Sequence, residues 1–254
     1  MGIANSFNLK GKKAFITGGA KGIGKSIGIC FAQAGADVAI LDIDNKKAEE
    51  AADELRKFGT EIIAIRVDTT KPEEVNEMIK KVLKNFGTID IAFNNAGICI
   101  TENAEDMSYE SWQKVININL TGVFLTAQAA GRIMINNKKG SIINTASMSG
   151  HVVNYPQGQC AYNASKAGVI LLTKSLAAEW AKYNVRVNSI SPGYVVTEMT
   201  MSDKDWIPIW KEHTPMKRLG NPEELQGTVL YLASDASTYT TGTDIIIDGG
   251  YTCW

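Results

Sequence analysis

A tyrosine and a lysine four residues apart, Tyr162 and Lys166, are the residues of this chain best suited to acid–base chemistry. In a helix, positions i and i+4 lie on one face, so the ammonium group can sit beside the phenol. A free phenol has a pKa of about 10, and a nearby fixed cation favours the phenolate and lowers that pKa. The pair can therefore take a proton from an alcohol or give one to a carbonyl. The same spacing occurs by chance in many helices, so the rest of the chain decides its meaning.

A glycine-rich turn near the start of the chain has the pattern of a phosphate-binding loop. Its sequence, Thr17-Gly18-Gly19-Ala20-Lys21-Gly22-Ile23-Gly24, lies between an expected strand and an expected helix. Glycines permit a tight turn and close approach of the backbone to phosphate, and the helix N-terminus adds free N–H groups and a positive dipole end. The spacing is not that of a Walker loop. The turn could be purely structural, but its place directly after a first strand and before a helix favours phosphate binding, with Gly18, Lys21, Gly22, Ile23 and Gly24 as the candidate residues for a dinucleotide.

Asp42 closes the next expected strand and bears on the choice of cofactor. A carboxylate there can accept hydrogen bonds from both hydroxyls of the adenosine ribose, and it repels the 2′-phosphate of NADP, which favours arginine. The alternative roles are a helix N-cap or a solvated acid, although Asp44 is better placed to cap the following helix. Lys21 favours NADP instead, because a basic residue in the glycine turn could help to bind the extra phosphate group. We give Asp42 more weight and predict NAD, with NADP the lesser alternative.

The elements that must position these residues alternate between short β-branched runs and longer helical patterns. The expected strands are continuous apolar runs, which is typical of parallel strands covered on both faces. We predict strands over Lys12–Thr17, Asp37–Asp42, Glu61–Val67, Ile89–Phe93, Gly140–Thr145, Val185–Ile190 and Asp244–Ile247. We predict helices over Ile23–Ala34, Lys46–Phe58, Pro72–Phe86, Ser108–Asn136 (as one helix or more), Gly158–Tyr183 and Pro222–Ser234. The alternation predicts an α/β fold, a doubly wound Rossmann domain with a mostly parallel seven-stranded sheet and helices on both faces.

No linker, repeat or low-complexity segment divides the chain, so residues 1–254 are expected to form a single catalytic domain. The irregular part is Pro192–Met216, which is rich in methionine and aromatic residues. Apolar residues on a loop after a strand suggest a lid or a partner surface, and core packing of a short helix is an equal alternative. We expect a mobile substrate lid around residues 194–216.

Composition narrows the classes of function. The chain is 44% apolar and 21% charged, with a net charge of -1, which is ordinary for a soluble protein and gives no indication of nucleic-acid or membrane attraction. The first residues lack the apolar run of a signal peptide, and no membrane span is expected. Four scattered cysteines without a Cys-x-x-Cys motif indicate reduced thiols and a cytoplasmic location. With only two histidines, no metal site is expected.

Glycine and polar residues follow three further expected strands. Asn94-Asn95-Ala96-Gly97 follows the fourth, Ser147 the fifth and Pro192-Gly193 the sixth. Open α/β sheets bind ligands at these carboxyl ends of their strands. Together with the glycine turn and the pair Tyr162 and Lys166, these motifs resemble the short-chain dehydrogenase/reductase family. The resemblance extends from Lys12 to Gly250.

The resemblance implies an enzyme that transfers a hydride between nicotinamide and a secondary alcohol or ketone. It makes Tyr162 the catalytic acid/base, Lys166 the group that lowers its pKa and holds the nicotinamide ribose, and Ser147 the group that polarises the substrate oxygen. Asn119 matches the family's helix asparagine, which supports a water-linked proton path to the lysine. The implied cofactor contacts are Gly18 and Ile23 at the pyrophosphate, Asp68 at adenine, Asn95, Ala96 and Gly97 along the adenosine and ribose, and Val195 and Thr197 at the carboxamide, with Pro192 and Gly193 also in the site.

The loop before Tyr162 bears on the substrate. It is slightly longer than in many family members and carries Asn154, Gln157 and Gln159, with His151 nearby. Such side chains suit a hydroxyl-rich ligand. The loop and the ending Asp248–Trp254 resemble the polyol/ketose (arabinitol, sorbitol, sorbose) dehydrogenase subgroup, so we predict a sugar alcohol or ketose. The predicted substrate contacts are Ser147, His151, Gln157 and Tyr162, although His151 fits a structural rim residue at least as well.

Other functions stay open at this point. The stretch Pro215–Gly220 is equally similar to gluconate 5-dehydrogenases and also occurs in 3-oxoacyl carrier-protein reductases. A catalytically silent nucleotide-binding scaffold is the alternative from a different class. The resemblance further implies a homotetramer whose dimerising helices include the one that carries Tyr162 and Lys166. The apolar tail Tyr251–Trp254 could dock on a neighbouring subunit.

Overall fold

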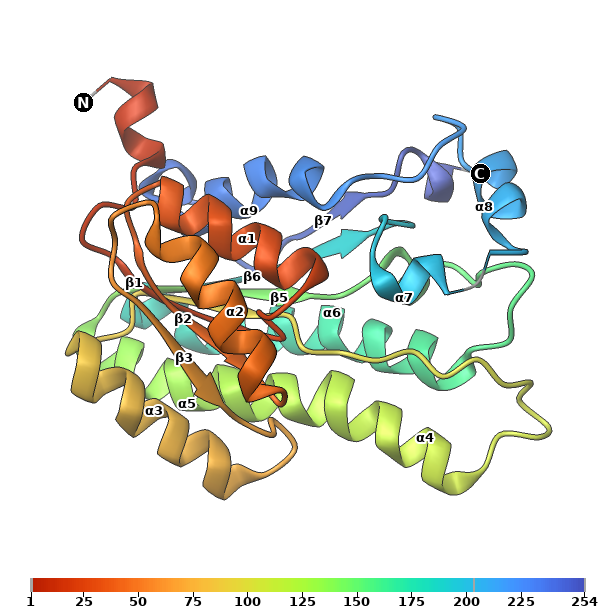
Figure 1. Cartoon of the computed structure of the whole chain (residues 1–254), viewed down its shortest axis with the longest axis horizontal. Helices are drawn as coiled ribbons and strands as arrows, with labels where there is room; N and C mark the ends of the chain where they lie inside the picture. The colour runs from red at the N-terminus through yellow and green to blue at the C-terminus, as the bar shows by residue number, and fades with distance from the viewer. Residues whose placement is uncertain (1, 203, 254) are drawn as a thin grey trace.

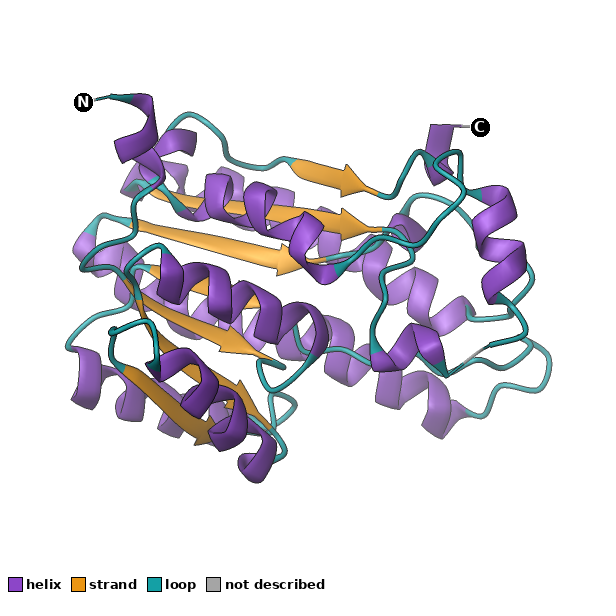
Figure 2. Cartoon of the chain, turned by 45° about the horizontal axis from the view of Figure 1, so that its top comes forward, coloured by secondary structure: helices purple, strands orange, loops and turns teal. Residues whose placement is uncertain are grey.

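Seven parallel strands form one sheet in the computed structural model, which describes residues 2–202 and 204–253 (Figures 1 and 2). The strands are β1 (Lys13–Thr17), β2 (Asp37–Asp42), β3 (Ile62–Arg66), β4 (Ile91–Asn94), β5 (Gly140–Thr145), β6 (Val185–Pro192) and β7 (Asp244–Ile247). Their order is β3-β2-β1-β4-β5-β6-β7, and every neighbouring pair is parallel. The strand order reverses between β1 and β4, because β2 and β3 are added on one side of β1 and β4 to β7 on the other. Sheets of this kind bind ligands at such a switch point.

Helices cover both faces of the sheet, which confirms the predicted doubly wound α/β fold (Figure 1). One face carries α1 (Gly22–Gln33), α2 (Asn45–Arg56) and α9 (Gln226–Ala233), and the other carries α3 (Pro72–Phe86), α5 (Gly122–Asn137) and α6 (Cys160–Trp180). Successive side chains of a strand point to opposite faces. Accordingly Ile16 of β1 is buried with α1 and α9, whereas its neighbour Phe15 is buried with α3 and α5.

Local signals in the sequence fix several helix ends. The Asp44 carboxylate accepts a hydrogen bond from the backbone N–H of Lys47 at 3.1 Å and caps α2, as predicted. Pro72 occupies the first turn of α3, where a missing N–H costs nothing. Gly87 ends the same helix in the left-handed conformation, with φ of 76°. α2 and α3 therefore begin at the carboxyl edge of the sheet, after β2 and β3, and Gly87 leads the chain back to the start of β4 at the opposite edge.

Some elements differ from the prediction. The region Ser108–Asn136 is α4 (Tyr109–Ile116), a π-helical turn (Asn117–Thr121) and α5, because Ser108 caps α4 through Ser111 and the polar residues at the turn bond elsewhere. The helix expected from Gly158 begins at Cys160, since Gln159 has a non-helical backbone, and the one expected from Pro222 opens as a 3-10 turn before α9.

The stretch Pro192–Met216 is more regular than expected. It contains two short helices, α7 (Glu198–Met201) and α8 (Ile207–His213), at the carboxyl ends of β5 to β7 (Figure 1). Thr197 caps α7, and burial of Trp210 holds α8 against the body of the protein. Asp203, between the two helices, lies outside the described residues.

One helical segment is as long and as apolar as a membrane-spanning helix, which was not expected from the sequence. The joined helix over Tyr109–Asn137 is long and apolar enough to cross a membrane, and half of its most apolar window is buried inside the protein. Core helices can have the same length and composition, because they too must be apolar on the side that packs. In this fold α5 packs on the sheet through Ala127, Ala130 and Met134.

Candidate active site

Two adjoining cavities lie at the carboxyl ends of the strands. The first, of about 590 Å³, extends from the glycine turn to Tyr162. The second, of about 410 Å³, lies beyond Tyr162 under α7 and α8. Tyr162 and Met199 line both. Of the predicted site residues, the first cavity collects Gly18, Lys21, Gly22, Ile23, Asp42, Asp68, Asn95, Ala96, Gly97, Tyr162, Lys166 and Thr197. The second collects Ser147, Gln157, Tyr162 and Gly193.

The glycine turn is held open by Asn95. The Asn95 side-chain amide donates to the carbonyl oxygens of Thr17 at 3.2 Å and Gly18 at 3.1 Å. Gly18 has φ of 60°, which favours glycine, and a Cβ added at Gly24 would lie 2.1 Å from the Gly18 oxygen. Gly24 is therefore needed for close packing of α1 on the turn and does not itself line the cavity. The bare turn and the N-terminus of α1 together leave room for a phosphate group.

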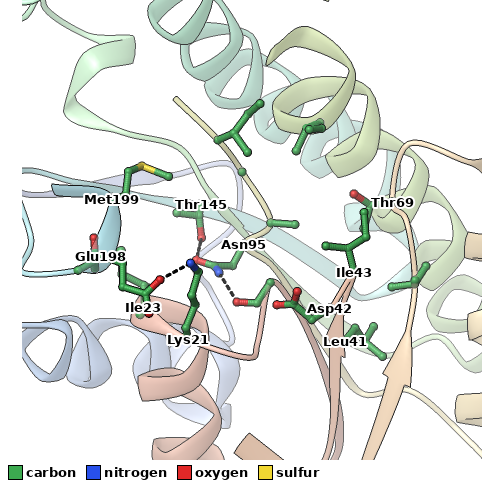
Figure 3. A pocket seen from close by; sticks show the side chains of 18 of the residues that line it. Lys21, Ile23, Leu41, Asp42, Ile43, Thr69, Asn95, Thr145, Glu198 and Met199 are labelled. Atoms are coloured by element: carbon green, nitrogen blue, oxygen red, sulfur yellow. Dashed lines mark hydrogen bonds and ion pairs between the residues drawn. The ribbon is translucent and has the colours of Figure 1, made fainter. Parts of the chain in front are cut away.

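Asp42 and Asp68 lie at the far end of the first cavity. Figure 3 shows Asp42 and Ile43 on one side of it, and Glu198 and Met199 on the other. The Asp42 carboxylate is oriented by the backbone N–H groups of Ala20, at 3.2 Å, and Asp44, at 3.1 Å. Because those contacts come from backbone groups, the carboxylate keeps lone pairs for a ligand hydroxyl.

Lys21 does not point toward Asp42. Its ammonium group forms an ion pair with Glu198, at the start of α7. Both side chains are more than half exposed, so the pair contributes little to stability. The ion pair nevertheless joins the glycine turn to α7 across the mouth of the first cavity (Figure 3).

Tyr162, Lys166 and Ser147 come together where the two cavities meet. The Lys166 ammonium donates to the carbonyl oxygen of Thr145 at 2.7 Å and lies 5.6 Å from the centre of the Tyr162 ring. The Ser147 hydroxyl is hydrogen-bonded to the Tyr162 phenol. α6 carries the tyrosine and the lysine one turn apart, and β5 supplies Thr145 and leads into Ser147. The predicted helical pairing of the phenol and the ammonium group is therefore present.

The balance of pKa effects differs from the expectation. Burial raises the pKa of Tyr162 to about 12, and the hydrogen bond from Ser147 only partly offsets it. Burial also lowers the pKa of Lys166 to about 8. The sequence argument considered the cation alone, whereas removing both groups from water opposes the charged form of each. In the protein by itself, desolvation is the largest effect on the pKa of both groups.

Asn119 lies on the π-helical turn between α4 and α5 and is completely buried. Its side-chain oxygen accepts from the backbone N–H of Ile98, and its nitrogen donates to the Ile98 carbonyl, both at 2.9 Å. The nitrogen also donates to the Ser165 hydroxyl at 3.1 Å. A Cβ added at Gly97 would lie 3.3 Å from the Asn119 oxygen and 3.6 Å from the Lys166 nitrogen, so all three residues border one small space. π turns are frequent at functional sites.

The second cavity has a wall of side-chain amides. Asn154, Gln157 and Gln159 are each less than a tenth exposed and bond to one another. The phenol of Tyr194, in the loop after β6, accepts from the amides of Asn154 and Gln157, both at 3.0 Å. The Trp210 indole N–H of α8 donates to the Gln157 oxygen at 3.1 Å. The sequence did not predict a site role for Tyr194 or Trp210. Their only signal was the high content of aromatic residues in the irregular stretch.

Besides Gly24 and Asn119, three predicted residues lie outside both cavities: His151, Pro192 and Val195. The His151 ring is 2.7 Å from the carboxylate of Asp244 on β7, so it anchors the loop and does not line the substrate cavity. Val195 is buried and pairs with Gly220, and Pro192 is buried at the end of β6. The spacing along the sequence could not separate these supporting positions from their neighbours Gly193 and Thr197, which do line cavities.

The first cavity fits a nicotinamide dinucleotide. The glycine turn would hold the pyrophosphate, Asp42 the adenosine ribose and Asp68 the adenine end, while Tyr162 and Lys166 close the opposite end. The second cavity would then leave room for a substrate on the far side of the same phenol.

Comparison with known proteins agrees with this arrangement. A family profile described as enoyl-(acyl carrier protein) reductase matches residues 18–252. A sorbose reductase of Candida albicans is 47% identical over 99% of this chain and 90% of its own length. A probable NADP-dependent mannitol dehydrogenase of Yarrowia lipolytica is 46% identical over 99% of this chain and 91% of its own.

A solved structure gives the same assignment. The crystal structure of a short-chain type dehydrogenase/reductase from Mycobacterium marinum is 47% identical, covers 99% of this chain and all of that one, and superposes with a TM-score of 0.98. Identity of this extent over the full length confirms the resemblance that the motifs indicated. The chain belongs to the short-chain dehydrogenase/reductase family of nicotinamide-dependent oxidoreductases.

Proposed function

We propose that the protein interconverts a sugar alcohol and a ketose, with NAD(H) as its cofactor. The observation that carries the substrate proposal is the wall of three buried amides in the cavity that Tyr162 shares. These amides bond to one another, to Tyr194 and to Trp210, and the acceptor lone pairs that remain on their oxygens suit a chain of hydroxyl groups better than a hydrocarbon. The names of the relatives, a sorbose reductase and a mannitol dehydrogenase, support the same class of substrate.

Ser147, Tyr162 and Lys166 have different roles in the proposed reaction. A substrate oxygen in the second cavity lies within reach of the Ser147 hydroxyl and the Tyr162 phenol. Tyr162 gives a proton to a ketone oxygen or removes one from a hydroxyl. Lys166, fixed by Thr145, supplies the positive charge beside the phenol. A bound nicotinamide supplies the hydride chemistry, and the protein orients the two reactants.

The panel of substrates that tests this proposal contains polyols, ketoses, gluconate, a hydroxysteroid and an acetoacetyl thioester, each with NAD and NADP. Nicotinamide absorbance reports turnover, and a dye-shift melt reports cofactor binding. We expect turnover of at least one polyol–ketose pair. Fast thioester reduction without polyol turnover would reject the substrate proposal, and cofactor binding without any turnover would favour a silent scaffold.

The pKa of Tyr162 predicts different pH dependences for the two directions of the reaction. With a pKa near 12 the phenol is protonated at neutral pH and ready to donate, so ketone reduction should be nearly flat from about pH 6 to 8. Oxidation needs the phenolate and should rise with pH, then level as Lys166 loses its proton above about pH 8. Initial rates in both directions at constant ionic strength measure this. Oxidation that falls between pH 6 and 8 contradicts it.

We propose NAD over NADP because of Asp42, although the mannitol dehydrogenase relative carries an NADP-dependent name. The fixed carboxylate bonds to ribose hydroxyls and repels a 2′-phosphate. We expect wild-type kcat/KM to favour NAD by at least about tenfold, and Asp42→Ser with Ile43→Arg to shift the ratio at least about 100-fold toward NADP. Lys21→Met serves as the comparison variant and should leave the ratio nearly unchanged. A wild-type preference for NADP would overturn the proposal.

We propose a homotetramer in which α6 contributes to a subunit contact. Leu171 on α6 is 66% exposed, and Tyr109 on α4, which packs on α6, is 71% exposed, so both helices present a large apolar side chain to solvent. The C-terminal tail is less available than expected, because the Tyr251 ring packs edge-on against Tyr194 of the same chain at 5.5 Å. Trp254 lies outside the described residues. Light scattering that gives a monomer mass at micromolar concentration would reject the tetramer.

A further inference from the structure

The amide of Gln157 can be oriented from its partners alone. An indole N–H can only donate, so the group of Gln157 that lies 3.1 Å from Trp210 must be the oxygen. The nitrogen then donates both of its hydrogens, to Tyr194 at 3.0 Å and to Gln159 at 3.2 Å. Among the described residues, these partners use both hydrogens of the nitrogen and one lone pair of the oxygen. The second lone pair of the oxygen can therefore still accept a hydrogen bond. Gln157 offers an acceptor to the second cavity.

An aromatic clamp holds this orientation. The rings of Tyr194 and Trp210 stack with their centres 4.2 Å apart and their planes within 11°. Burial keeps the Tyr194 phenol neutral by raising its pKa, so it accepts hydrogen bonds without bringing a charge into the cavity. Tyr194 lies in the loop after β6 and Trp210 on α8. The Tyr194 phenol accepts from the Gln157 nitrogen, and the Trp210 indole N–H donates to the Gln157 oxygen. The acceptor cannot rotate into a donor without breaking three bonds.

The described residues that line the second cavity carry no charged group. The described residues that line it include serine, threonine, asparagine, glutamine, tyrosine and tryptophan, and among them there is no lysine, arginine, histidine, aspartate or glutamate. Lys166, the cation beside Tyr162, lines the first cavity and donates to the carbonyl oxygen of Thr145. A carboxylate or phosphate placed in the second cavity would lose its water without gaining a cation, which is costly.

We infer that the second cavity selects an uncharged polyol chain, in which a hydroxyl group away from the reacting carbon donates to Gln157, and that it rejects chains of the same length that end in a carboxylate or phosphate. This inference rests on the proposed function and narrows it. It separates a hexitol from gluconate, which differ at one end of the same six-carbon chain. The clamp residues Tyr194 and Trp210 act as positioning residues for the acceptor.

The test compares kcat/KM for mannitol or sorbitol with that for gluconate, under the same cofactor and pH. We expect gluconate to be at least about 100-fold poorer than the better hexitol. Gln157→Lys should raise the gluconate-to-hexitol ratio at least about tenfold, because it places a cation in the cavity. Gln33→Lys, at an exposed position at the end of α1, is the matched control and should leave the ratio unchanged.

A second variant keeps the test informative if Gln157→Lys does not fold. Tyr194→Phe keeps the ring for stacking and removes the acceptor of two amides. We expect its kcat/KM for the hexitol to fall at least about fivefold, mainly through KM, and its kcat/KM for cyclohexanone, which has no second hydroxyl group, to fall less. Equal losses on both substrates would show that the clamp is merely structural.

The outcomes separate the two proposals. If wild-type enzyme oxidises gluconate within about threefold of the hexitol, the inference of an uncharged substrate is overturned and the polyol function stands. If the hexitols are not turned over but the acetoacetyl thioester is, the proposed function itself fails.

Discussion

The Tyr162→Phe enzyme is expected to lose about 10²- to 10⁴-fold of its kcat in both directions, because general acid–base catalysis by a positioned group is worth that much. The variant removes one oxygen and leaves the ring, which is half-buried on α6 where the two cavities meet. Cofactor binding should survive, since the glycine turn and Asp42 are untouched. Steady-state rates and NADH fluorescence titration measure the two effects separately.

The matched control is Tyr239→Phe. Tyr239 is fully exposed, so the same loss of a hydroxyl should leave kcat and KM unchanged. Near-native turnover by Tyr162→Phe would refute the assignment of the acid/base, whatever the control shows. Loss of NADH binding together with turnover would instead indicate that the phenol supports the site structurally.

Gly24→Ala is expected to abolish cofactor binding, with an affinity for NAD(H) at least about 100-fold weaker or no soluble protein. The new Cβ would lie 2.1 Å from the backbone oxygen of Gly18 and 2.7 Å from the Asn95 amide nitrogen. Neither is the flexible end of a side chain, because Asn95 is held by its bonds to the turn. The start of α1 must therefore move away from the turn, and the phosphate cradle is lost.

Gly227→Ala provides the comparison for Gly24→Ala. Gly227 is an exposed residue of α9, and a Cβ added there meets nothing within 4 Å. Since alanine is a better helix former than glycine, this variant should be slightly more stable, by about 0.5–1 kcal/mol. Thermal melts with and without NADH follow both variants. A Gly24→Ala protein that retains the wild-type melting shift on adding NADH would contradict the steric argument.

Much of the fold could be predicted because its signals are local. The strand Asp37–Asp42 and the helix Pro72–Phe86 have the predicted bounds, since an apolar run, a proline in the first turn and a terminal glycine each act on neighbouring residues. The glycine turn and the pair Tyr162 and Lys166 are also short-range patterns. Their positions at one edge of the sheet follow from the parallel topology, in which all strands end on the same side.

What the sequence could not show depends on contacts between distant segments. Gln157, Tyr194 and Trp210 form one hydrogen-bonded wall, yet each comes from a different loop or helix, and no spacing links them. His151 was expected near the substrate because it is close in sequence to the loop, but its ring turns to Asp244. The pKa of Tyr162 likewise depends on burial, which is a property of the folded protein alone.

The π-helical turn at Asn117–Thr121 makes the length of this segment as important as its composition. In an α-helix each residue advances the chain by about 100° around the axis. Deleting one residue inside the turn would allow a continuous α-helix. The deletion would also rotate α4 and the first part of the turn by about 100° relative to α5. Asn119 would then face away from Ile98, although every neighbouring residue type were kept. Single-residue deletions in this segment should therefore be tolerated far less well than substitutions on its exposed side.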